Sequence, residues 1–150
     1  MKKTSGDLLL VENDARIVEL LTWFLQRRGH GVRTATSYAQ ARGCILERRP
    51  DLVLSDVDLG PENARTLLPQ LAREGLLPPT LVVSGYVDRE VAAELMAIPG
   101  VIGVLAKPFE FPRLERLIDE FLARPRGAPI TAAGSASNGV QRTYGGAPGP

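Results

Sequence analysis

Short apolar runs that alternate with helix-period segments are the feature that most constrains the fold of this 150-residue chain. Five runs of strand length occur between residues 7 and 123, and each leads into a polar segment. They span residues 8–11, 32–35, 52–55, 81–83 and 102–105. Strands joined to helices by short connections favour right-handed crossovers and a parallel sheet. The sequence therefore predicts an α/β fold with a doubly wound five-stranded parallel sheet and helices on both faces.

The segments between these runs carry residues that begin or end helices. Asp14, Ser37 and Asp88 stand where N-caps are expected, and Ser37 with Gln40 resembles a capping box. Gly29 is placed to end the first helix. The apolar helical faces are expected at Ile17, Leu20, Leu21 and Phe24; Ala41 and Ile45; Leu67, Leu68 and Leu71; Val91, Ala92 and Leu95; Leu114, Leu117, Ile118, Phe121 and Leu122.

The composition and periodicity of the sequence change at residue 124. Ten of the last 27 residues are glycine or proline, and no helical or strand period continues. Such a composition buries too little apolar surface to offset a backbone ordering cost of about 1–2 kcal/mol per residue. We predict one folded domain over residues 7–123 and a disordered Pro/Gly-rich tail over residues 124–150.

Charge and composition argue against several classes of partner. Eighteen basic and 17 acidic residues give a net charge of +1, which provides no large attraction to nucleic acid. No apolar run approaches the roughly 18–20 residues of a membrane span. The single cysteine, Cys44, cannot form an internal disulfide and is expected to be a small core residue. These features predict a cytoplasmic protein.

His30, the only histidine, is expected in a solvated turn.

Reactive polar side chains follow four of the five runs. Glu12 and Asn13 follow the first run, Asp56 the third, Ser84 the fourth and Lys107 soon after the fifth. Because the carboxyl ends of parallel strands meet at one edge of a sheet, these side chains are expected to converge. An acidic corner, a carboxylate, a hydroxyl and an ammonium group together predict a site that accepts a phosphoryl group.

Residues 7–123 resemble the receiver domain of bacterial response regulators, the CheY-like family. The matching motifs are VEND at residues 11–14, PDLVLSD at 50–56, SGY at 84–86 and KPF at 107–109. The resemblance implies a flavodoxin-like sheet of order 2-1-3-4-5. It also implies a stand-alone phosphorylation switch in two-component signal transduction. Asp56 would accept the phosphoryl group from a sensor histidine kinase or phosphotransfer protein.

The resemblance further implies a magnesium site and roles for two other side chains. Asp56, the Asn13 side chain and the Asp58 backbone carbonyl would ligate Mg²⁺, and Glu12 would reach it through water. Lys107 would pair with Asp56 and then with a phosphoryl oxygen, to which Ser84 would also donate a hydrogen bond. No enzymatic activity is expected beyond self-catalysed phosphorylation and dephosphorylation.

Two positions depart from the family pattern. Asn13 stands where the acidic turn normally has a second carboxylate, and Asp58 is available to restore that charge. Val104 replaces the Tyr or Phe whose rotation normally reports phosphorylation, and Tyr86 is a partial substitute. These departures leave open a pseudo-receiver, which is the same fold acting as a fixed interaction module.

A second alternative is a phosphatase similar to the haloacid dehalogenases. Asp56 and Asp58 resemble its Asp-x-Asp pair, and Ser84 and Lys107 match its second and third motifs. It is disfavoured because Gly60 stands where Thr or Val is common, and because no acidic pair follows Lys107 on another strand.

The output is expected to occur by contact with a downstream protein. By resemblance, the contact face comprises the fourth helix, the fifth strand and the fifth helix, at residues 88–97, 102–105 and 110–122. Binding to nucleic acid or to a membrane is not expected, and homodimer formation is left open.

Overall fold

The computed structural model describes residues 5–59, 61–85 and 88–124. A parallel sheet of five strands in the order β2-β1-β3-β6-β7 forms its centre, which confirms the predicted order because β6 and β7 are the fourth and fifth long strands. The strands are β1 (Asp7–Val11), β2 (Gly31–Ala35), β3 (Leu52–Asp56), β6 (Thr80–Ser84) and β7 (Val101–Ala106). Tyr86 and residues 125–150 lie outside the described residues, so the tail prediction is not tested.

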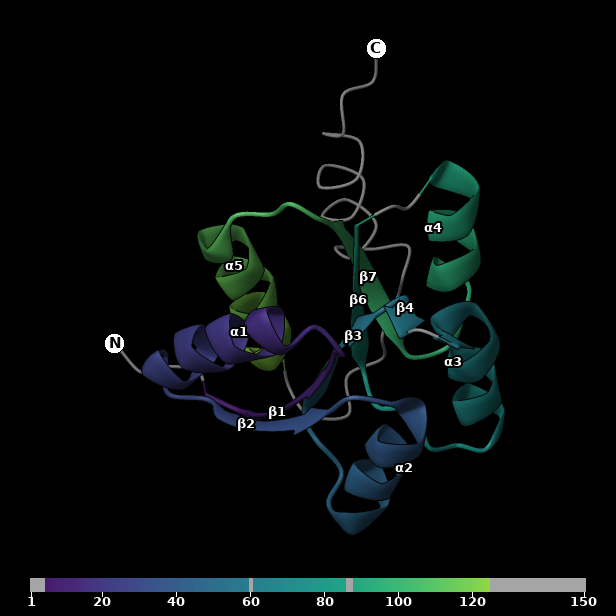
Figure 1. The fold of residues 1–150 in the computed structure, drawn as a ribbon, viewed down its shortest axis with the longest axis horizontal. Coiled ribbons are helices and arrows are strands. Elements are labelled where there is room, and N and C mark those ends of the chain that lie inside the picture. Colours follow the sequence, from purple (N-terminus) through teal and green to yellow (C-terminus); the bar gives the residue numbers. More distant parts are fainter. Residues whose placement is uncertain (1–4, 60, 86–87, 125–150) are drawn as a thin grey trace.

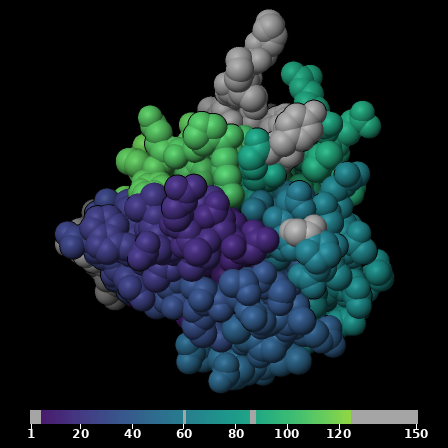
Figure 2. Space-filling view, in the orientation of Figure 1, coloured from purple at the N-terminus to yellow at the C-terminus, as the bar shows by residue number. Residues whose placement is uncertain are grey.

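Helices cover both faces of this sheet, as predicted. Figure 1 shows α1 and α5 on one face and α2, α3 and α4 on the other. The helices are α1 (Ala15–Arg27), α2 (Tyr38–Glu47), α3 (Ala64–Arg73), α4 (Arg89–Met96) and α5 (Phe111–Leu122). In the space-filling view, the purple atoms of α1 lie between the green atoms of α5 and the blue atoms of α2 (Figure 2). Among the described residues, no helix is sufficiently long and apolar to span a membrane.

The sheet separates two apolar clusters. Leu9, Val53 and Val82 belong to the cluster under α2, α3 and α4, whereas Leu10 and Leu54 belong to the cluster under α1 and α5. Successive strand side chains point to opposite faces, and both faces are covered. The double coverage explains why the strands appear in the sequence as continuous apolar runs rather than as an alternating pattern.

The predicted N-caps are confirmed. The Asp14, Ser37 and Asp88 side chains accept hydrogen bonds from the backbone N–H groups of Arg16, Gln40 and Val91 at 3.0, 3.1 and 2.8 Å. The capping box is only half formed, because the Gln40 side chain accepts from the Thr36 N–H at 2.8 Å rather than from Ser37. Gly29 follows α1 with a φ of 95°, a conformation that favours glycine.

Two predictions about individual side chains are wrong. His30 is only 5% exposed, because β2 begins directly after it at Gly31, and its Nδ1 accepts a hydrogen bond from the Gly6 N–H at 3.2 Å. Leu20 is 52% exposed, because α1 directs Leu21, Phe24 and Leu25 toward the core. Cys44 is partly buried against the core, as expected.

A two-stranded antiparallel hairpin was not predicted. It consists of β4 (Asp58–Leu59) and β5 (Glu62–Asn63) and connects β3 to α3. Asn63 also caps α3, because its side chain accepts from the Arg65 N–H at 2.8 Å. The hairpin places Asp58 directly beside the end of the central strand.

Candidate functional site

The carboxyl edge of the sheet brings together the four positions at which the sequence predicts chemistry. The pairing register places Val11 beside Ser55, Asp56 beside Val83 and Ser84 beside Ala106. Glu12, Asp56, Ser84 and Lys107 therefore occur at neighbouring strand ends. The Ser84 carbonyl also accepts a hydrogen bond from the Lys107 N–H at 2.7 Å, which joins the last two of these segments.

Lys107 contacts two carboxylates. Its Nζ lies 3.2 Å from Oε1 of Glu12 and 3.7 Å from Oδ2 of Asp56. The predicted Lys107–Asp56 pair is thus present, and the pair with Glu12 is an additional contact. The peptide bond between Lys107 and Pro108 is cis.

Asp56 is largely buried at the end of β3, with 13% of its side chain exposed. Its Oδ1 accepts a hydrogen bond from the Val57 N–H at 2.7 Å and lies 3.5 Å from the Asp58 nitrogen. Burial raises the pKa of the Asp56 carboxyl, and the charge of Glu12 raises it further, while Lys107 opposes both effects. Two carboxylates thus share one ammonium group, an arrangement that favours binding of a further cation.

Glu12 is held in place by the backbone around it. It is 3% exposed, its N–H donates to the Ala35 carbonyl at 3.0 Å, and its Oε2 accepts from the Asp14 N–H at 3.1 Å. The turn after β1 therefore fixes the carboxylate that faces Lys107. Asn13, the adjacent residue, is exposed.

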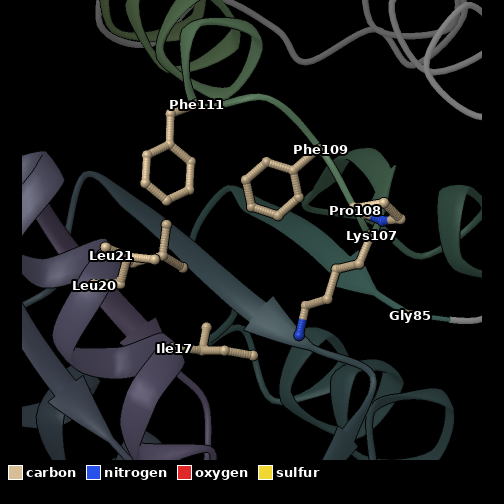
Figure 3. A pocket seen from close by; sticks show the side chains of 8 residues that line it. All are labelled: Ile17, Leu20, Leu21, Gly85, Lys107, Pro108, Phe109 and Phe111. Atoms are coloured by element: carbon tan, nitrogen blue, oxygen red, sulfur yellow. The ribbon is translucent and has the colours of Figure 1, made fainter.

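A groove of about 470 Å³ lies beside Lys107. Phe109 and Phe111 face the α1 side chains across it, and the Lys107 ammonium points toward Ile17 (Figure 3). Its lining residues are Ile17, Leu20, Leu21, Gly85, Lys107, Pro108, Phe109 and Phe111. An apolar surface thus borders the charged site on the side of α1.

The sequence profile of the response regulator receiver domain matches residues 8–119 of this chain. The chain belongs to the response regulator receiver domain family. Receiver domains are signalling domains of two-component systems, and this assignment agrees with the fold and with the order of the motifs along the chain.

Curated transcriptional regulators are similar to most of this chain. The DNA-binding transcriptional regulator NtrC of Rhizobium meliloti is 30% identical over 91% of this chain. The transcriptional regulatory protein ZraR of Salmonella typhimurium is 29% identical over 89%. The chain spans only 28% and 31% of the lengths of these two relatives.

Solved structures show the same fold. NtrX from Brucella abortus has a TM-score of 0.69 at 28% identity, covering 79% of this chain and 26% of that one. A candidate response regulator from Chloroflexus aurantiacus has a TM-score of 0.70 at 29% identity, covering 80% of this chain and 99% of that one.

The oxygen atoms expected to hold magnesium in this receiver domain come from mixed groups. Asp56 would contribute a carboxylate, Asn13 an amide and Asp58 a backbone carbonyl, and both Asn13 and Asp58 are exposed. Within the described residues, no three His, Cys, Asp or Glu side chains converge as a metal site. The three ligands expected here include only one carboxylate side chain, so they do not require such a cluster. Oxygen donors close to the carboxylates of Glu12 and Asp56 fit the ligand preferences of Mg²⁺.

Sequence reasoning missed Tyr38 and Glu62. The Tyr38 hydroxyl lies 2.5 Å from Oγ of Ser55 and donates to the Asp56 carbonyl at 3.0 Å, while Oε1 of Glu62 accepts from the Tyr38 N–H at 2.7 Å. Burial raises the pKa of the Tyr38 hydroxyl, so it remains protonated at neutral pH. The only signal in the sequence is that a buried tyrosine needs a hydrogen-bond partner.

Val104 is 1% exposed in the core under α2, α3 and α4. It pairs with Val82 of β6, the strand that leads to Ser84. The position expected to carry a rotating aromatic ring in a receiver domain is therefore occupied by a buried aliphatic side chain.

Proposed function

We propose that this receiver domain accepts a phosphoryl group on Asp56 from a sensor histidine kinase or phosphotransfer protein. The supporting observation is the position of the Lys107 ammonium, within 4 Å of both Glu12 and Asp56. A fixed positive charge at this point attracts an incoming phosphoryl group and offsets the repulsion between it and the carboxylates.

The reaction transfers a phosphoryl group from a nitrogen of the donor histidine to a carboxylate oxygen of Asp56. A carboxylate oxygen of Asp56 attacks, the bond between phosphorus and the donor imidazole nitrogen breaks, and an aspartyl phosphate forms. Lys107 pairs with a phosphoryl oxygen as charge moves, and the Ser84 hydroxyl donates a hydrogen bond to another. Asp56, Asn13, the Asp58 carbonyl and, through water, Glu12 would hold a magnesium ion, which would supply positive charge next to the phosphoryl oxygens.

The phosphodonor is proposed to approach along α1. A donor histidine must reach Asp56, and the apolar groove beside Lys107 lies next to that route (Figure 3). Leu20 and Trp23 of α1 are 52% and 56% exposed, which adds apolar surface for a protein partner.

The output is proposed to occur through protein contact at the face formed by α4, β7 and α5. We propose a cytoplasmic, non-enzymatic regulator that acts without contact to nucleic acid, although NtrC is described as a DNA-binding regulator. The folded domain is proposed to comprise residues 7–123. Deletion of residues 126–150 would then leave the thermal midpoint nearly unchanged.

A pseudo-receiver is the second candidate. It is favoured by Asn13 in the acidic turn and by the buried Val104, which together reduce the negative charge of the metal site and remove the usual aromatic switch. Stable formation of an aspartyl phosphate separates the two candidates.

The test uses acetyl phosphate with Mg²⁺ as the phosphodonor. The expected product carries one phosphoryl group, detected as a mass increase and lost at alkaline pH. Asp56→Asn is expected to abolish the product. A parent protein that stays unmodified supports the pseudo-receiver, and modification that persists in the variant excludes Asp56 as the acceptor.

A further inference from the structure

Tyr38 forms hydrogen bonds both to the end of the phosphoacceptor strand and to the hairpin that follows it. Its hydroxyl lies 2.5 Å from Oγ of Ser55 and donates to the Asp56 carbonyl at 3.0 Å. Its backbone N–H donates to Oε1 of Glu62 at 2.7 Å. One residue of α2 thus contacts both the end of β3 and the second strand of the hairpin, β5.

The contact at the hydroxyl controls the orientation of a particular peptide. The Asp56 carbonyl lies 3.0 Å from the Tyr38 hydroxyl and 2.9 Å from Oγ of Ser55. Because the two hydroxyl oxygens are 2.5 Å apart and have one proton each, Ser55 donates to Tyr38 when Tyr38 donates to the carbonyl. The opposite side of the same peptide is the Val57 N–H, which donates to Oδ1 of Asp56 at 2.7 Å. Because a peptide unit is planar, fixing the carbonyl also fixes the direction of the N–H. The Tyr38 hydroxyl therefore acts, through this peptide, on the carboxylate proposed to attack phosphorus.

The contact at the backbone N–H holds the hairpin. Glu62 pairs with Leu59 across it, and Asp58 pairs with Asn63. Tyr38 is the first residue of α2, where N–H groups have no partner within the helix and where a carboxylate is favoured by the helix dipole. Glu62 therefore connects the hairpin that carries Asp58, the proposed source of a backbone ligand, to the beginning of α2.

Packing alone does not account for the hydroxyl of Tyr38. The ring belongs to the same buried cluster as Val57 and Leu59 and is 5% exposed. A phenylalanine would fill this space equally well. The hydroxyl instead makes its hydrogen bonds to the last two residues of the phosphoacceptor strand, and a buried hydroxyl requires such partners.

We infer that Tyr38 is a positioning residue for phosphorylation, which holds the Asp56–Val57 peptide through its hydroxyl and the hairpin carrying Asp58 through its N–H. This inference rests on the proposed function of Asp56. It assigns a role in the reaction to the beginning of α2, which contributes no side chain to the charged site itself.

Tyr38→Phe tests the hydroxyl and leaves the backbone contact with Glu62 in place. The matched control is Thr80→Val, which removes another buried hydroxyl that donates to a backbone carbonyl, that of Pro78 at 2.8 Å. Thr80 begins β6, at the sheet edge opposite the site. Each variant removes one buried hydroxyl that donates to a backbone carbonyl, so both thermal midpoints are expected to fall, by at least as much in Tyr38→Phe because its hydroxyl also contacts Ser55.

Two measurements separate positioning from general stability. The first is the amide hydrogen-exchange rate of Val57, expected to rise about fivefold in Tyr38→Phe, the equivalent of one lost hydrogen bond. The second is the rate of phosphorylation at saturating acetyl phosphate and Mg²⁺, expected to fall by a similar factor. Thr80→Val is expected to change neither quantity.

Equal phosphorylation rates in Tyr38→Phe and Thr80→Val would overturn the inference, as would unchanged Val57 exchange in Tyr38→Phe. An unphosphorylated parent would instead overturn the proposed function and with it the reaction assigned to Tyr38. The exchange rates would still report whether the hydroxyl holds the peptide, so the two failures are distinguishable.

A second pair of variants tests the contact at the hairpin. Glu62→Gln retains an oxygen that can accept from the Tyr38 N–H, whereas Glu62→Ala removes it. The Mg²⁺ concentration that gives half-maximal phosphorylation is expected to stay within about twofold of the parent value in Glu62→Gln. In Glu62→Ala this concentration is expected to rise about fivefold. Equal half-maximal Mg²⁺ concentrations in the two variants would overturn the role of this contact.

Discussion

The Lys107 ammonium lies 3.2 Å from the carboxylate of Glu12, although the two residues are 95 positions apart in the chain. Glu12 is buried, whereas about a fifth of the Lys107 side chain is exposed. A buried carboxylate needs a compensating charge, and in this structure Lys107 provides it. The same ammonium also faces Asp56 at 3.7 Å, so stability and the proposed chemistry depend on one side chain.

Lys107→Met is expected to lower the free energy of unfolding by about 2 kcal/mol at neutral pH, because Glu12 loses its charge partner. Lys107→Arg is the control, since it retains the positive charge. We expect Mg²⁺ to stabilise Lys107→Met more than the parent, because the cation replaces the missing charge. Urea denaturation with and without Mg²⁺ measures both effects. Identical unfolding of the Met and Arg variants would contradict the role of the ammonium.

Asp56→Asn is expected to stabilise the folded protein at pH 7. Burial, reinforced by Glu12, raises the pKa of Asp56 in the folded state, so its ionisation lowers stability as the pH rises above the unfolded value of about 4. The gain on substitution should be about 1 kcal/mol at pH 7 and should shrink as the pH falls toward 4. Urea denaturation across this range checks the trend. A variant less stable than the parent at pH 7 would contradict it.

His30 is expected to make folding sensitive to mild acid. Burial lowers the pKa of His30, although the charges of Asp119 and Glu115 oppose this effect. The unfolded chain therefore binds a proton first, and stability is lost as the pH falls below about 6.5 toward the folded value. Protonation also prevents Nδ1 from accepting the Gly6 N–H.

His30→Asn provides the comparison, because its amide oxygen can accept the same hydrogen bond without titrating in this range. We expect its thermal midpoint to fall less than that of the parent between pH 7 and pH 5. His30 is the only histidine in the chain, so no other imidazole contributes. Equal falls in the two proteins would show that His30 is not the titrating group.

Asn13→Asp is expected to tighten magnesium binding. Unit charges about 4 Å apart interact by roughly 4 kcal/mol at an effective dielectric near 20. Desolvation and repulsion from Glu12 and Asp56 reduce this gain to about 1 kcal/mol, or several-fold in affinity. Titration calorimetry with Mg²⁺ measures it. Equal affinity in parent and variant would mean that Asp58 already supplies the charge or that Asn13 does not face the metal.

Local features of the fold are predictable because their partners are near in the sequence. Asp14, Ser37 and Asp88 cap helices through N–H groups two or three residues away. The hairpin of β4 and β5 escapes prediction because its strands are two residues long, too short for a period. His30 is buried and accepts a hydrogen bond from Gly6, 24 positions earlier, a contact that local sequence does not indicate.

The residue pattern is sufficient to predict which polar groups gather at one edge of the sheet. Apolar runs set the strand ends, and parallel strands of one sheet all end on the same side, so Asp56, Ser84 and Lys107 had to meet there. The pattern does not predict that Lys107 contacts Glu12 more closely than Asp56, or that the Tyr38 hydroxyl contacts the Asp56 carbonyl. Such contacts depend on strand register and helix packing, which place side chains to within about an ångström, finer than any residue pattern specifies.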